Sequence, residues 1–146
     1  MALKVELKPK ERIIIGTVVI RNDDQRTRLF IEGEAPILRE KDILTSALAD
    51  SPAKKIYLAL QLMYLSQDIG KHHGTYFALV KEFLQAAPSA LPLIAEINNR
   101  ILNDELYKAL KAARRLIAYE QDLIANATGG ERVRKGRTNS PVGKGA

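Results

Sequence analysis

The spacing of apolar residues changes once along this chain, near residue 45, and this change constrains the fold more than any other feature. Before it, apolar and polar residues alternate; after it, apolar residues recur at spacings of three and four. The first pattern is typical of half-buried strands and the second of amphipathic helices. Strands followed by helices predict an α+β protein, in which a small N-terminal antiparallel β-sheet unit packs with a C-terminal four-helix part.

The predicted strands lie within the first 40 residues and are separated by turn-forming residues. They span residues 2–8, 13–20, 26–32 and 37–39. The second of them holds two β-branched triplets, one on each side of Gly16, with apolar side chains on both faces. We expect a central or doubly covered strand there, with a bulge or bend at the glycine.

Four longer helices are predicted after a short one at residues 42–48. They span about residues 52–65, 71–86, 89–101 and 104–124, with caps expected at Ser51, Ser89 and Asn103. The first is apolar almost all round and should be the central helix.

Individual side chains on these helices are assigned to the core or to solvent by the same spacing. In the first helix, only Lys54, Lys55 and Gln61 are expected to face water clearly. In the second, Phe77 should face the core, and in the fourth, Glu120 should lie on the solvated side.

The formal net charge of +6 is unevenly distributed along the chain. Residues 127–146 hold five basic side chains and one acidic one, and they contain nothing that could build a core, so we expect a disordered basic tail. The β-rich unit then covers residues 1–45 and the helical part residues 46–126. These 126 residues hold 18 basic and 16 acidic side chains, so the balanced body gives no general electrostatic argument for binding nucleic acid.

The residue inventory excludes several kinds of chemistry. Zero cysteines rule out disulfides, thiol catalysis and cysteine-ligated zinc. His72 and His73 diverge by about 100° on a helix and have no carboxylate in ligand register, so no metal site is predicted. No nucleophile is paired with a base, and the isolated glycines at 16 and 33 cannot cradle a phosphate. We therefore expect neither an enzyme nor a cofactor.

The apolar runs of the chain are too short to span a membrane, and no basic-then-apolar leader is predicted at its start. Together with the lack of cysteine, this pattern favours a cytoplasmic protein.

Basic side chains on and near the predicted strands are the candidate binding residues. They are Lys8, Lys10, Arg12, Arg26, Arg28 and Arg39. Arginine suits phosphates because its planar fork donates two hydrogen bonds at once. The alternative, which the residues alone favour, is an ordinary solvated sheet face balanced by Glu6, Glu32 and Glu34. Phe30 is the only aromatic residue of the predicted sheet, so RNA contact would depend on arginines and exposed backbone groups.

Three separated blocks occur in order over about residues 2–126. They are KPKERIIIGTVVIRN with RTRLFIEGEAPILREKDIL, then SPAKKIYLALQLMYL, and finally LYKALKAARRLIAYEQDL. Together they resemble the FlbT flagellar regulators of alphaproteobacteria, although many of those proteins have Asn-Gly where this chain has Ile15-Gly16. The resemblance implies a post-transcriptional regulator that acts on the 5′ leader of flagellin mRNA, limits translation, promotes decay and works alongside the small protein FlaF.

A shorter likeness lies within the first block. The run KERIIIG, the segment RLFIEGEAP and the segment REKDI are similar to the carbon storage regulator CsrA. This likeness implies RNA contacts near Val5 to Lys8 and at Arg39-Glu40.

The sequence thus predicts a repressor that binds the flagellin mRNA leader through its β-sheet unit. The alternative is a protein-binding module that captures FlaF or a flagellin export component and controls RNA only indirectly. A homo-oligomer is left open, and no membrane partner is expected.

Overall fold

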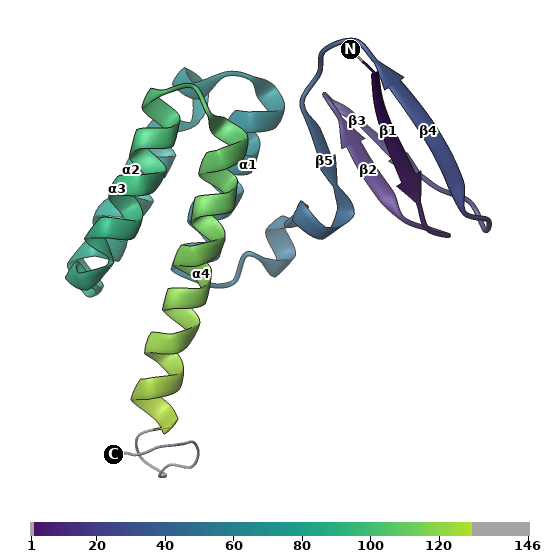
Figure 1. Cartoon of the computed structure of the whole chain (residues 1–146). Helices are drawn as coiled ribbons and strands as arrows, with labels where there is room; N and C mark the ends of the chain where they lie inside the picture. The colour runs from purple at the N-terminus through teal and green to yellow at the C-terminus, as the bar shows by residue number, and fades with distance from the viewer. Residues whose placement is uncertain (1, 130–146) are drawn as a thin grey trace.

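The computed structural model describes residues 2–129, in which a β unit lies beside a group of helices (Figure 1). Within these described residues, five strands precede four α-helices, which confirms the α+β class. The last helix continues to Gly129, so the first three residues of the predicted tail are helical. The rest of that tail, residues 130–146, lies outside the described part of the chain.

The β unit consists of two small antiparallel sheets. Its strands are β1 (Ala2–Leu7), β2 (Arg12–Ile15), β3 (Val18–Arg21), β4 (Thr27–Glu32) and β5 (Ile37–Arg39). β1 pairs with β4, and β2 lies between β3 and β5. Val5, Leu7 and Ile13 form a small core of their own, which the inward faces of both sheets share.

The single strand predicted across residues 13–20 is instead a hairpin. Ile15 pairs with Val18, so the chain reverses through Gly16 and Thr17. Gly16 has a φ of +61°, and glycine at the first position of a two-residue loop is typical of a type II′ turn. The expected bulge or bend within one strand is therefore wrong: glycine between β-branched residues suits a turn equally well, and the pairing of Ile15 with Val18 shows that a turn forms. β3 is an exposed edge strand rather than a covered one.

The helices are close to their predicted positions. They are α1 (Pro52–Ser66), α2 (Ile69–Ala86), α3 (Leu91–Leu102) and α4 (Leu106–Gly129). The short helix predicted at residues 42–48 is instead two 3₁₀ turns, Glu40–Asp42 and Ser46–Leu48.

Of the three predicted caps, the structure confirms one. Ser51 Oγ accepts the backbone N–H of Lys54 at 3.3 Å, and Pro52 occupies the first turn, which explains the sharp start of α1. Ser89 makes no cap bond to α3, because a 3₁₀ turn at Pro88–Ala90 comes before that helix. Asn103 is the residue that ends α3, and its N–H donates to the carbonyl of Asn99 at 3.0 Å.

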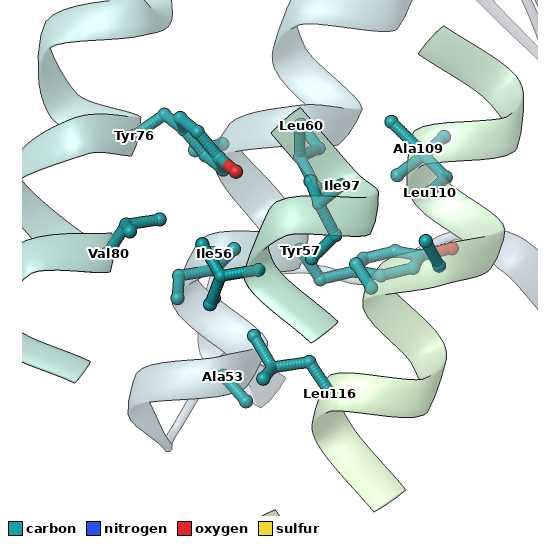
Figure 2. Close-up of a cluster of buried hydrophobic side chains, with 14 of the residues drawn as sticks. Ala53, Ile56, Tyr57, Leu60, Tyr76, Val80, Ile97, Ala109, Leu110 and Leu116 are labelled. Atoms are coloured by element: carbon teal, nitrogen blue, oxygen red, sulfur yellow. The ribbon is translucent and has the colours of Figure 1, made fainter. Parts of the chain in front are cut away.

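α1 is the central helix, as predicted, and it packs against both α2 and α4. Figure 2 shows Ile56 and Leu60 of α1 among buried side chains from the neighbouring helices. Gln61 is also buried, against expectation, because it bonds to the segment that leads out of the β unit. Phe77 is 49% exposed, and its neighbour Tyr76 occupies the core in its place. Glu120, expected on the solvated side of α4, is buried as well.

Candidate nucleic-acid interface

The outward face of β1 and β4 gathers more of the predicted binding residues than any other part of the β unit. Lys4 lies opposite Phe30, and Glu6 lies opposite Arg28. Successive strand residues point to opposite faces, and Val5 and Leu7 point into the core, so these four side chains point outward. Lys8 and Arg26 follow directly at the end of the pair where the strands part. We call this set of six residues the basic strand face.

One carboxylate holds two arginines on the basic strand face. Arg28 Nη2 lies 3.3 Å from one oxygen of Glu6, and Arg26 Nη1 lies 3.8 Å from the other. All three side chains are about half exposed. Exposed ion pairs contribute about 0–1 kcal/mol to stability, so a phosphate could replace the carboxylate at little cost. With Lys4 and Lys8, four cations lie on or beside this face with two carboxylates, Glu6 among them and Glu32 at the other end of β4, which is exposed on the same side as Phe30.

Phe30 lies in the middle of this face and is 65% exposed. Its position opposite Lys4 leaves the ring beside a cation, on a sheet face that the helices do not cover. An exposed aromatic ring flanked by basic side chains is the arrangement that single-strand-binding proteins use to stack a base and hold its phosphate.

The other three predicted residues lie elsewhere on the β unit. Lys10 Nζ is 2.7 Å from Asp24 in the turn before β4, and its backbone has a φ of +67°. Arg12 pairs through Nε with Glu40 at 3.3 Å. Arg39 is exposed and borders a cavity on the side of the β unit that meets the helices. The six predicted residues therefore do not form one surface.

Glu40 organises a second basic group on the other sheet. The backbone N–H of Arg12 donates to Glu40 at 2.7 Å, and this bond lowers the pKa of the Glu40 carboxyl below its ordinary value. Arg21 lies opposite Arg12 across the hairpin and is exposed. Arg21 and Lys4 were not among the predicted residues. The alternation of residues 2–8 could have found Lys4, but Arg21 needed the hairpin.

Three polar side chains of α1 join the helices to the β unit. Tyr64 accepts the N–H of Ile37 at 3.1 Å and donates to its carbonyl at 3.0 Å. Gln61 accepts the N–H of Leu44 at 2.8 Å and donates to its carbonyl at 3.0 Å. Tyr57 donates to the carbonyl of Asp42 at 2.7 Å, and burial raises the pKa of this tyrosine. Both parts are therefore held together through the backbone of residues 37–44.

Asp42 completes this joint from the other side. Its buried carboxylate bonds to Arg114 of α4, lies 3.9 Å from Lys111 Nζ and accepts the hydroxyl of Tyr107 at 3.3 Å. A cavity of about 380 Å³ lies beside Asp42, and its wall is formed by both apolar and charged side chains. The lining residues are Leu3, Ala35, Ile37, Arg39, Lys41, Asp42, Tyr64 and Tyr107. No sequence signal distinguishes Asp42 from the exposed carboxylates.

Residues 2–129 have neither a candidate metal site nor a helix that could span a membrane. This part of the chain has no cluster of histidine and acidic side chains arranged to hold a metal ion. In the same residues, no helix combines the length and the apolar character that crossing a membrane requires.

Comparison with known proteins gives the family directly. The family model described as flagellar protein FlbT matches residues 3–124. The chain belongs to the FlbT family. A FlbT relative from Bradyrhizobium diazoefficiens, named a probable flagellum biosynthesis repressor protein, is 63% identical over 124 residues, which cover 84% of this chain and 85% of that protein.

More distant FlbT relatives match over similar lengths. The protein from Rhodopseudomonas palustris strain TIE-1, also named a probable repressor, is 50% identical over 86% of this chain and 99% of its own. The flagellum biosynthesis repressor protein FlbT of Caulobacter vibrioides is 33% identical over 89% of this chain and 94% of its own. No solved structure matches the chain. The likeness to the carbon storage regulator therefore stays a prediction.

Proposed function

We propose that this protein represses flagellum biosynthesis by binding the 5′ leader of flagellin mRNA in the cytoplasm and limiting its translation or stability. The FlbT relatives, which are named repressors rather than enzymes, support a regulatory role in flagellum biosynthesis. The choice of RNA as the ligand depends on one observation: the basic strand face places four cations and an exposed Phe30 around the carboxylate of Glu6, and the face gains only one further carboxylate, Glu32, at its far end.

The mechanism requires no chemistry from the protein. Arg26 and Arg28 exchange the carboxylate of Glu6 for RNA phosphates, and Lys4 and Lys8 hold the flanking phosphates. Phe30 stacks on an unpaired base between them. When the leader is held in this way, the ribosome cannot load onto it, or the message is left exposed to nucleases. The helices support the β unit through the joint at residues 37–44.

The test measures binding of the full-length protein to its own flagellin leader. Replacing Arg26 and Arg28 by alanine should weaken binding and make the slope of log affinity against log salt shallower by about 0.7 for each phosphate that the variant no longer binds. The matched control replaces Lys55 and Arg115, two exposed cations of the helical part, and removes the same net charge. Equal affinity for both double variants, each shown to be folded, would contradict the proposed contacts.

Two single substitutions test the same face in opposite directions. E6Q releases both arginines from their carboxylate and should tighten leader binding. F30A should weaken binding by about 1–3 kcal/mol if the ring stacks on a base. F77A is its control, because Phe77 is a similarly exposed phenylalanine on α2. An F30A protein that binds as tightly as F77A would remove stacking from the mechanism.

The second candidate function is an adaptor without direct RNA contact. It would capture a FlaF-like protein or a flagellin export component through its helices. A groove of about 310 Å³ near the end of α4 supports this candidate, because Phe83, Ala86 and Leu123 give it a largely apolar wall. The adaptor requires the partner for any effect on RNA, and helix contacts respond little to salt. Leader binding by purified protein without FlaF separates the two candidates.

A further inference from the structure

The three-stranded sheet of the β unit has two edge strands, β5 and β3, and they differ in whether their outward backbone groups are covered. At the β5 edge, the Tyr64 hydroxyl bonds to both the N–H and the carbonyl of Ile37, so these outward backbone groups are satisfied. At the β3 edge, every residue is exposed, and the side chains include Val18 at 56% and Val19 at 60% exposure. Within the described residues, no helix or loop covers this edge as Tyr64 covers the other.

The backbone groups that face outward from β3 follow from the hairpin. The N–H of Asn22 donates to the carbonyl of Glu11 at 2.8 Å, so these two residues form a hydrogen-bonded pair. Hydrogen-bonded and non-bonded pairs alternate along an antiparallel ladder. Val19 and Arg21 therefore belong to non-bonded pairs with β2, and their N–H and C=O groups point away from the sheet. Such an edge is a template for another strand.

We propose that β3 pairs antiparallel with β3 of a second copy of this chain, about a two-fold axis at Val19. The two three-stranded sheets then form one six-stranded sheet. This interface is isologous, because the same strand contributes both sides. It does not depend on whether RNA is the ligand.

A second copy is favoured over an unrelated strand because β3 is self-complementary in one register. With the axis at Val19, each Val18 faces Ile20 of the other copy, Val19 faces Val19, and Arg21 faces Thr17. With the axis at Ile20, Val18 would instead face Asn22, whose side chain already bonds to the carbonyls of Lys8 and Gln25. With the axis at Arg21, two arginines would be directly opposed, which is destabilising.

The dimer should be weak and should respond to salt in the direction opposite to RNA binding. The contact involves one strand of four residues, far less than the area buried in stable complexes. Each copy carries a net charge of +6, so the copies repel each other and added salt should favour pairing. RNA binding weakens with salt because it releases counterions.

The test is sedimentation of nuclease-treated full-length protein from micromolar to near-millimolar concentration. The wild type should show a monomer–dimer equilibrium. V19K places two like charges at the axis and should raise the dimer dissociation constant by about tenfold or more. L102K is the matched control, because Leu102 is 82% exposed at the end of α3 and gains the same charge. It should leave the dissociation constant unchanged.

Two further variants keep the proposal open to refutation if V19K folds poorly. V19P removes a donor that makes no bond within the monomer, so the fold should persist while the dimer no longer forms. The chain has no native cysteine, so V19C should be cross-linked to a dimer by a short bis-maleimide, whereas L102C should not. A wild type that stays monomeric throughout, or a dimer unaffected by V19K and V19P, would overturn the proposal.

Discussion

Replacing Asp42 by alanine should destabilise the protein more than the removal of any exposed ion pair in the β unit. Its side chain is only 4% exposed, and it bonds to Arg114, Lys111 and Tyr107 of α4. The substitution leaves two cations without their carboxylate at the joint between the β unit and the helices.

The magnitude follows from how well the abandoned cations can rehydrate. Removing one partner of a fully buried ion pair costs about 3–5 kcal/mol. Arg114 and Lys111 are each 42% exposed, so water can replace part of the interaction with the carboxylate. We therefore expect D42A to lower the free energy of unfolding by about 2 kcal/mol. D23A should lower it by less than about 0.5 kcal/mol, because Asp23 pairs with Lys10 on the open surface.

Urea denaturation followed by circular dichroism measures both values, provided that the slope against urea is unchanged. A double-mutant cycle of D42A with R114A should give a coupling energy of about 1–2 kcal/mol. Equal losses of stability for D42A and D23A would refute the claim that this carboxylate holds the two parts together, as would additive effects of D42A and R114A.

Three further predictions concern polar groups whose hydrogen-bond partners the sequence did not indicate. E120A should lower the free energy of unfolding, measured by urea denaturation, by about 2 kcal/mol, because this buried carboxylate accepts a backbone N–H in the first turn of α1 at 2.9 Å. E120Q should lower it less. Q61L should lower the free energy of unfolding by about 2–3 kcal/mol, because the backbone N–H and carbonyl of Leu44 both lose their hydrogen-bond partner. It should also speed the hydrogen exchange of residues 37–44, and an unchanged exchange rate would contradict this. Glu40 has a lowered pKa in the folded state, so its stabilising effect is present above its ordinary pKa and is lost as the pH falls through the lowered pKa. E40Q should therefore make the free energy of unfolding fall less steeply at acid pH. An unchanged fall would argue against the Arg12 bond as the cause of the lowered pKa.

Features that depend on residues close together in the chain could be predicted. The change of spacing near residue 45 gave the fold class, and Ser51 with Pro52 gave the start of α1. The outward position of Arg28 followed from simple alternation. Each of these depends on hydrogen bonds or side-chain directions within a few residues, which local sequence specifies.

Gln61 and Glu120 could not be placed in this way. Both are polar, and a spacing argument assigns polar residues to solvent. Their burial is favourable only because the backbone of Leu44 and the first turn of α1 supply partners, and those partners lie 17 and 67 residues away. The Gly16 turn is similar, since only the pairing of Ile15 with Val18 separates a turn from a bulge.

The candidate site also has one part that the local sequence predicts and another that only the tertiary structure decides. The sequence by itself determined which cations lie on or beside strands and that Arg26 and Arg28, two residues apart, share a face. It could not tell that Lys8 joins them while Arg12, on the other sheet, bonds to Glu40. That separation was decided by the tertiary pairing of β1 with β4 and of β2 with β3 and β5. Strand partners are chosen by the joint burial of apolar residues distant in sequence, and no local pattern encodes that choice.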